Sequence, residues 1–187
     1  MTHRKVGLDL FKGKCVLDIG CGRNKVPGAV GLDRVPLPDV DVVADLDGEL
    51  PFPDQTFDVV SANQVLEHVR ELVTLVYEAH RVLKPGGLLI AHVPYFRSSW
   101  AHIDPTHVRC FTINSMDYFV EGTHCHAHYR FRDAAFRRVE VLLDNDFRPR
   151  MVRRVFSALA LRFPNRFENS FLSYLYPFQQ LTYVLEK

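Results

Sequence analysis

Apolar runs alternate along the chain with segments in which apolar residues recur every three or four positions. Runs rich in Val, Ile and Leu are typical of buried strands, and a longer periodic segment is typical of an amphipathic helix. A Lys-Pro-Gly-Gly sequence at 84–87 would end that helix. The alternation predicts a parallel sheet flanked by helices. The expected strands lie near 15–19, 29–32, 40–43, 57–61 and 88–92, and the expected helix covers 64–83.

The first expected strand runs into a turn with two glycines, in the sequence Val-Leu-Asp-Ile-Gly-Cys-Gly-Arg-Asn at 16–24. Gly20 and Gly22 allow positive φ angles and leave room for a ligand close to the main chain. A dinucleotide-binding turn would carry a third glycine, which packs a helix on the strand beneath a pyrophosphate. Asn24 ends this stretch without that glycine, which argues against NAD as the ligand.

Six motifs follow one another in the first half of the chain. They are Asp18-Ile-Gly-Cys-Gly22, Gly31-Leu-Asp33, Ala44-Asp45-Leu46, Pro51-Phe-Pro-Asp-Gln-Thr-Phe-Asp-Val-Val60, Val65-Leu-Glu-His-Val69 and Arg81-Val-Leu-Lys-Pro-Gly-Gly87. In this order they resemble the class I S-adenosylmethionine-dependent methyltransferases over residues 14–93. The resemblance implies an α/β, Rossmann-like doubly wound sheet, mostly parallel with an antiparallel last strand. It also implies S-adenosylmethionine as the cofactor.

The resemblance assigns cofactor contacts to residues at the ends of the first four strands. Asp33 would accept hydrogen bonds from both ribose hydroxyls, a role that suits a carboxylate. Asp45 and the Leu46 amide would hold the adenine, and Asn63 would contact the methionine end. The turn residues that complete the cofactor set are Asp18, Gly20, Cys21 and Gly22. Among them, Asp18 would brace the turn and the amine of the ligand.

One spacing departs from the family pattern. Asp33 lies 11 residues after Gly22, and Pro27-Gly28 interrupts the interval. A full helix and strand in this interval would place the acid about 20 residues after the glycine turn. We therefore expect the first helix to be shortened or replaced by a loop.

The segment after the fifth expected strand, 92–112, is rich in aromatic and titratable side chains. It should face the acceptor, because ligands of open α/β sheets bind beyond the carboxyl ends of the strands. Its Asp-Pro-Thr-His and Phe-Thr elements resemble the small-molecule and glycan-type branch of the family. His107, His102 or Asp104 could take the proton of the acceptor, since an imidazole titrates near neutral pH. Each of them could instead be a structural hydrogen-bonding group.

A metal site is the alternative interpretation of two histidine-rich stretches. His102-x-Asp104-x-x-His107 and His124-Cys-His126-Ala-His128 contain groups that bind zinc or iron in proteins. Neither spacing matches a recognised zinc pattern, and methyl transfer from a sulfonium requires no metal, so no metal site is predicted. For the second stretch we expect a polar loop or hairpin at 121–130. The Glu67-His68 pair belongs either to the site or to the surface of a helix.

The last forty residues are the least family-like. From 148 to 187 there are seven Lys and Arg against two Glu, a net charge of +5. Apolar residues at 152, 155, 156, 159 and 163 share one helical face, and aromatic residues continue to 178. Expected strands at 139–143 and 181–185 enclose this segment. It is an insertion at about 148–180 that packs on the core, or forms a lid, a dimer contact or a membrane-surface element through 148–178.

Composition sets the remaining limits. A chain of 187 residues predicts one domain, 1–187, and a net charge of +1 gives no reason to expect nucleic acid as a partner. The first residues lack the apolar core of a signal peptide, no apolar run reaches about 20 residues, and the four cysteines lack a disulfide pattern. We expect a cytoplasmic methyltransferase that modifies an O, N or carboxyl acceptor on a small molecule or glycan or lipid precursor. The alternative is a non-catalytic S-adenosylmethionine-binding protein of the same fold.

Overall fold

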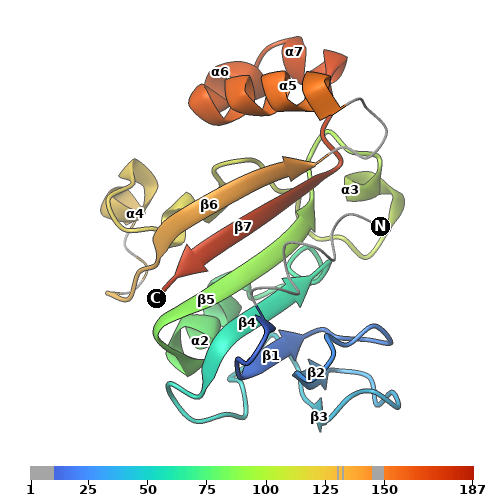
Figure 1. Ribbon diagram of the computed structural model, residues 1–187, viewed down its shortest axis with the longest axis vertical. Helices are drawn as coiled ribbons and strands as arrows, with labels where there is room; N and C mark the ends of the chain where they lie inside the picture. Colours follow the sequence, from blue (N-terminus) through green and yellow to red (C-terminus); the bar gives the residue numbers. More distant parts are fainter. Residues whose placement is uncertain (1–10, 130, 132, 145–149) are drawn as a thin grey trace.

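The computed structural model describes residues 11–129, 131, 133–144 and 150–187, so the first ten residues examined for a signal peptide lie outside it. A seven-stranded sheet crosses this part of the chain in the order β3-β2-β1-β4-β5-β7-β6 (Figure 1). Strands β1 to β5 pair in parallel, and β7 runs antiparallel to both β5 and β6. The predicted Rossmann-like sheet with an antiparallel last strand is confirmed. The strands are β1 (Val16–Ile19), β2 (Val30–Asp33), β3 (Val42–Val43), β4 (Phe57–Asn63), β5 (Leu83–Pro94), β6 (Arg137–Asp144) and β7 (Gln180–Glu186).

Each apolar run expected to form a strand does so, with changes at the ends. β1 is buried along its whole length and lies inside the sheet between β2 and β4, whereas β3 at the edge keeps only two residues. β5 is longer than predicted because the Lys-Pro-Gly-Gly segment pairs with the end of the chain. The Gly86 amide donates to the Lys187 carbonyl, and the Lys187 amide donates to the Gly87 carbonyl, both at 2.9 Å.

The helix expected at 64–83 is shorter, because α2 covers only Leu72–Val82. Gln64 has a φ of 55°, which a right-handed helix excludes. The Asp47 carboxylate then accepts the amide hydrogens of Arg70 and Glu71 at 2.7 and 2.9 Å, and so satisfies donors at the start of the helix. Residues 66–68 form a turn instead of helix. The buried face of α2 packs on one side of the sheet, in the main apolar core.

The loop predicted in place of the first helix is confirmed: among the described residues, no helix lies between β1 and β2. The polar loop or hairpin expected at 121–130 is wrong for the described part of that range. His124–Tyr129 form helix α4, in which the His126 amide donates to the Thr123 hydroxyl at 3.2 Å as at a helix N-terminus. The remaining helices are α3 (Trp100–Ile103), the 3₁₀ helix η1 (Ser115–Phe119), α5 (Arg150–Arg162), α6 (Pro164–Glu168) and α7 (Leu172–Leu175).

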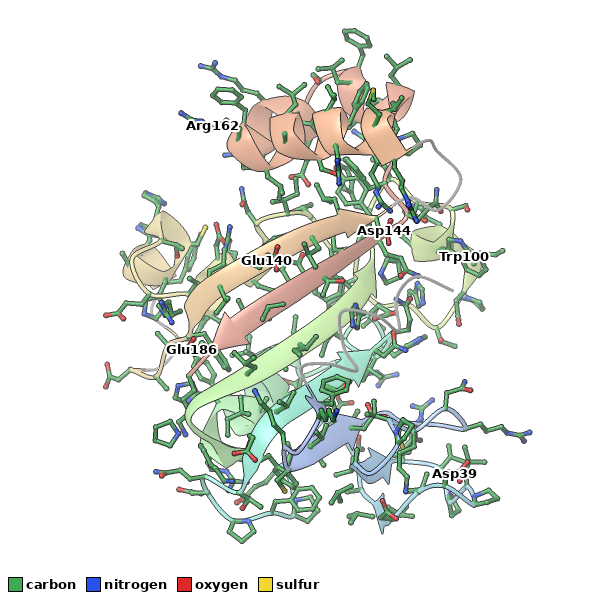
Figure 2. All side chains as sticks on the ribbon, viewed as in Figure 1. Asp39, Trp100, Glu140, Asp144, Arg162 and Glu186 are labelled. Carbon is green, nitrogen blue, oxygen red and sulfur yellow. The ribbon has the colours of Figure 1, made fainter. Side chains whose placement is uncertain are left out.

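The expected insertion is helical and lies beside the β6 edge of the sheet, where α5, α6 and α7 form one layer (Figure 1). Its first two residues, 148 and 149, lie outside the described ranges. Arg153 of α5 pairs with Asp144 at the end of β6, which is labelled in Figure 2. The Phe156 ring stacks on Tyr176 with centroids 4.5 Å apart. In the part of the chain that the structure describes, no helix is long and apolar enough to span a bilayer.

Candidate active site

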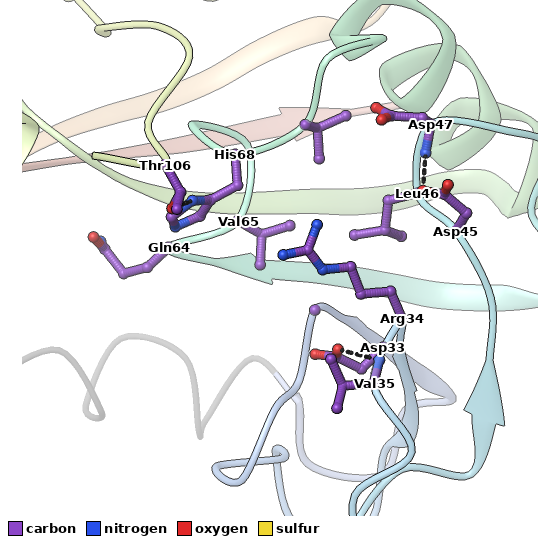
Figure 3. Close-up of a pocket in the computed structure, with 12 residues that line it drawn as sticks. Asp33, Arg34, Val35, Asp45, Leu46, Asp47, Gln64, Val65, His68 and Thr106 are labelled. Atoms are coloured by element: carbon purple, nitrogen blue, oxygen red, sulfur yellow. Dashed lines mark hydrogen bonds between the residues drawn. The ribbon is translucent and has the colours of Figure 1, made fainter. Parts of the chain in front are cut away.

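A cavity of about 290 Å³ opens where β1 to β4 end, at the carboxyl edge of the parallel strands (Figure 3). This is the position at which open α/β sheets bind ligands. Polar groups converge on the cavity from four separate loops, and valine and leucine side chains form the rest of its wall. An apolar wall with a few polar groups is typical of small-molecule sites. It is lined by Gly20, Asp33, Arg34, Val35, Asp45, Leu46, Asp47, Gln64, Val65, His68, Val69 and Thr106.

Gly20 forms the sharp turn after β1. Its φ is +62°, a conformation that side chains with a Cβ rarely adopt. A Cβ built on Gly20 would lie 2.2 Å from Cγ2 of Val65, which lines the same cavity. Glycine is therefore required here by backbone conformation and by packing.

Asp33 ends β2 and presents its carboxylate to the cavity. Its Oδ2 accepts the Gly22 amide hydrogen and its Oδ1 accepts the Val35 amide hydrogen, both at 2.9 Å. Two main-chain donors thus fix the orientation of the carboxylate. Each oxygen has a further lone pair, so the group can still accept hydrogen bonds from a ligand.

The loop after β3 supplies the opposite wall. Asp45 Oδ1 accepts the Asp47 amide hydrogen at 3.0 Å, and Asp47 in turn holds the start of α2. Figure 3 shows Arg34 extending between Leu46 and Asp33. This loop is therefore attached to the core through the first residues of α2.

Four of the residues predicted to bind the cofactor do not line the cavity. Asp18 is buried and its Oδ2 accepts the Val26 amide hydrogen at 2.8 Å, which braces the glycine turn. Burial raises the pKa of the Asp18 carboxyl, although its hydrogen bonds oppose this effect. Burial, followed by the nearby charge of Asp18, raises the pKa of the Cys21 thiol to about 11. Gly22 contributes its amide to Asp33, and Asn63 is exposed.

Gln64 takes the place in the cavity wall that the sequence assigned to Asn63. Its left-handed conformation turns the chain immediately after β4. Gln64 lines the cavity, and its side-chain nitrogen is buried with no hydrogen-bond partner among the described residues. The site therefore contains an unused donor.

A group of titratable side chains lies behind the wall at His68. The rings of His68 and His107 meet edge to face with centroids 4.6 Å apart. Glu67 is fully buried next to them, and burial raises the pKa of its carboxyl to about 7. Burial, followed by the charge of His107, lowers the pKa of His68. Both effects favour the neutral forms of these groups.

The predicted acceptor-side residues are placed at different distances from this group. Asp104 contacts it through Thr106, whose amide and hydroxyl donate to Asp104 Oδ1 at 2.8 and 2.7 Å. His107 contacts His68, which lines the cavity. His102 is exposed and its Nε2 lies 3.0 Å from the Phe96 carbonyl, and it lines no part of the cavity.

The fold and the sequence both match known proteins. The chain superimposes on a SAM-dependent methyltransferase from Archaeoglobus fulgidus with a TM-score of 0.61 and 20% identity, covering 95% of this chain and 88% of that one. Residues 27–91 match the family model described as "Methyltransferase domain". The chain therefore has the fold of the class I methyltransferases, and its residues 27–91 match a methyltransferase family model.

Two curated relatives give the extent of this match. The chain is 33% identical over 111 residues to a "Probable S-adenosylmethionine-dependent methyltransferase" of Mycolicibacterium smegmatis, and the match covers 50% of this chain and 41% of that protein. It is 40% identical over 62 residues to a demethylmenaquinone methyltransferase of Lysinibacillus sphaericus, covering 33% of this chain and 26% of that protein. The chain thus spans less than half the length of these relatives.

Four polar lining residues were not predicted as parts of the site: Arg34, Asp47, Gln64 and Thr106. Arg34 and Gln64 each directly follow a predicted site residue in the sequence, and this position could have indicated that they belong to the site. The Glu67-His68 pair is not a surface pair on a helix, because Glu67 is buried and His68 lines the cavity. The second histidine-rich stretch lies in α4, where His126 Nδ1 is 3.1 Å from the Tyr118 carbonyl.

Proposed function

We propose that this chain is an S-adenosylmethionine-dependent methyltransferase that acts on a small-molecule acceptor. The observation that carries the proposal is the Asp33 carboxylate, which two amides hold in the cavity wall beside the turn at Gly20. The match of residues 27–91 to the methyltransferase family model supports the same activity.

The residues of the cavity fit the adenosyl cofactor. Asp33 would accept the ribose hydroxyls, and Asp45 and Leu46 would hold the adenine from the opposite wall. The unpaired side-chain nitrogen of Gln64 is a donor that suits the carboxylate of the methionine portion. When bound, S-adenosylmethionine supplies an electrophilic methyl group on its sulfonium.

The acceptor would lie at the wall formed by Val65, His68 and Thr106. The chain contributes orientation, which is worth up to about 7 to 11 kcal/mol when two reactants are held in line. The imidazoles of His68 and His107 offer lone pairs at this end of the cavity. They would activate a hydroxyl or amine of the acceptor as a general base, by accepting its proton.

Two observations favour a small molecule over nucleic acid as the acceptor. The Lysinibacillus relative is named for demethylmenaquinone. The net charge of this chain is only +1, so it lacks the strongly basic balance that nucleic-acid binding domains have. The atom that receives the methyl group in our proposal is an O, N or carboxyl oxygen.

Calorimetric titration with S-adenosylhomocysteine tests the cofactor part of the proposal. Asp33→Ala should weaken binding at least about 100-fold, because two charge-assisted hydrogen bonds to the ligand are lost. Asp39→Ala is the matched control, since Asp39 is an exposed aspartate outside the cavity (Figure 2). Folded wild-type protein that binds neither S-adenosylmethionine nor S-adenosylhomocysteine would contradict the proposal.

Turnover distinguishes an enzyme from a protein that only binds the cofactor. Incubation with S-adenosylmethionine and a panel of small hydroxyl, amine and carboxyl compounds should release S-adenosylhomocysteine with at least one of them. The Asp33→Ala variant should release much less under the same conditions. Tight cofactor binding without product from any acceptor would favour the binding-protein alternative.

A further inference from the structure

Glu67, His68 and His107 form a compact group behind the acceptor wall of the cavity. One ligand atom from each, a carboxylate oxygen or an imidazole nitrogen, lies within 4.8 Å of the other two. Glu67 and His68 belong to the turn between β4 and α2, and His107 belongs to the loop after α3. The Val108 amide donates to the Glu67 carbonyl at 2.9 Å, so the main chain holds the two segments together.

The Glu67 side chain is the anomaly of this region. It is 0% exposed, and neither carboxylate oxygen has a hydrogen-bond partner among the described residues. Burying a carboxylate without a partner is unfavourable, and buried acids are normally paired or bound to a metal. A cation beside Glu67 would provide the missing partner.

The hydrogen bond of His107 determines which of its nitrogens is free. His107 Nδ1 lies 3.2 Å from the Ala101 carbonyl oxygen, which can only accept a hydrogen bond. The proton of a neutral His107 is therefore on Nδ1, and the lone pair is on Nε2. Metal-binding histidines typically donate their other ring N–H to a carbonyl or carboxylate in this way.

The same result holds for His68. Its Nδ1 lies 2.9 Å from Thr106 Oγ1, and that hydroxyl donates its single hydrogen to Asp104 Oδ1. The threonine oxygen must therefore accept from His68 Nδ1, which leaves the lone pair of His68 on Nε2. Asp104 and Thr106 thus orient His68 as a ligand.

We propose that Glu67, His68 and His107 bind one divalent transition-metal cation, of the class that includes Zn²⁺ and Co²⁺. One carboxylate and two neutral imidazoles are ligands that these cations prefer, and three protein ligands leave a coordination position open. At metal–ligand distances of about 2.1 Å the ligand atoms of a tetrahedral site are about 3.4 Å apart, so the present separations of up to 4.8 Å must shorten by up to about 1.4 Å.

The open position would face the cavity, because His68 lines it together with Thr106 (Figure 3). A hydroxyl of the acceptor could then bind the cation through its oxygen and release its proton to solvent more easily, as water does on zinc. With the cation bound, His68 and His107 would serve as ligands in place of the base. This part of the inference rests on the proposed function. The cation site itself depends only on the three side chains.

Metal binding is tested on untagged full-length protein that has been dialysed against a chelator. Titration with Zn²⁺, or with Co²⁺ followed by its visible absorption, should show one cation per chain. A hundredfold excess over Kd should raise the melting temperature by about 5 °C or more. Glu67→Gln and His107→Ala should each weaken binding at least about 100-fold.

His128→Ala is the matched control. His128 is an exposed histidine on α4 whose ring stacks on His124, so the substitution removes a surface imidazole pair and leaves the proposed site intact. The control should bind like the wild type. Wild-type protein without stoichiometric binding would overturn the proposal, as would a Glu67→Gln variant that is folded and binds equally well.

The outcome is independent of the proposed activity. Titration of the metal-free protein with S-adenosylhomocysteine measures the cofactor site alone. If that ligand binds and the cations do not, only the cation site is wrong. If the cations bind and the cofactor does not, the cation site stands and the methyltransferase proposal fails.

Discussion

Gly20 and Val65 approach each other so closely that a Cβ on the glycine would lie 2.2 Å from Val65 Cγ2. The two residues come from different loops, one after β1 and the other after β4, and both line the cavity. Their contact joins the glycine turn to the segment that carries Gln64 and His68. A change at Gly20 should therefore disturb both walls of the site.

Gly20→Ala should lower the free energy of unfolding by about 2 to 5 kcal/mol. A left-handed conformation costs an L-residue about 1 to 2 kcal/mol, and displacing Val65 adds about 1 to 3 kcal/mol of overpacking. Gly28→Ala is the control, because Gly28 has a φ of +80° with open space around it. Urea denaturation of both variants measures the difference, and equal losses would show that the Val65 contact costs nothing.

Asp47→Ala should destabilise the protein by about 1 to 2 kcal/mol, because the Arg70 and Glu71 amides lose their acceptor. The loop that carries Asp45 should also loosen, so the affinity for S-adenosylhomocysteine should fall. Asp47→Asn retains a side-chain oxygen and should be milder in both respects. Thermal melts and calorimetry test this, and an unchanged melting temperature for the alanine variant would contradict it.

Asp18→Asn should change how stability depends on pH. Burial raises the pKa of Asp18 in the folded state above its ordinary value of 3.8, so the folded protein binds more protons than the unfolded chain between these two values. The stability of the wild type therefore falls as pH rises through this window, and the asparagine variant lacks that fall. Chemical denaturation from pH 4 upward should show the variant gaining stability relative to the wild type. An unchanged difference between the two across this range would contradict the prediction.

The parts of the site that depend on local sequence were predictable. The run that forms β1 leads directly into Gly20, and the structure gives this glycine the positive φ that the pattern required. Asp33 likewise follows from its place at the end of an apolar run. In both cases a strand of few residues fixes the position of the residue that follows it.

The acceptor wall was less predictable because tertiary contacts determine it. Leu66 and Val69 have helical spacing, but α2 begins only at Leu72, so both residues precede the helix. The left-handed Gln64 then lines the cavity in place of Asn63. Periodicity cannot predict either effect. Over only five residues, a turn and a helix that bury the same apolar side chains have the same sequence pattern.

The face of α5 that packs inward also differs from the apolar stripe in the sequence. Phe156 is half-buried against Tyr176 and Ala160 is fully buried, whereas Val155 is 63% and Met151 79% exposed. Packing against the aromatic residues of α6 and α7 therefore selects the inner face. The outward apolar residues, next to the arginines of α5, keep the lid, dimer and membrane-surface interpretations open to test.

Phe156→Ala should lower the free energy of unfolding by about 3 kcal/mol, the lower end of the cost of truncating a buried phenylalanine, because its ring is only partly enclosed. Phe163→Ser should leave it nearly unchanged, since Phe163 is 42% exposed.

The double variant Met151→Ser with Val155→Ser should also keep the melting temperature of the wild type. If the outer face of α5 contacts anionic membranes, this pair should reduce flotation with anionic vesicles while binding of S-adenosylhomocysteine is retained. Equal flotation of the wild type and the double variant would exclude that contact. Sedimentation of both proteins would then test whether the outer face of α5 forms a dimer contact.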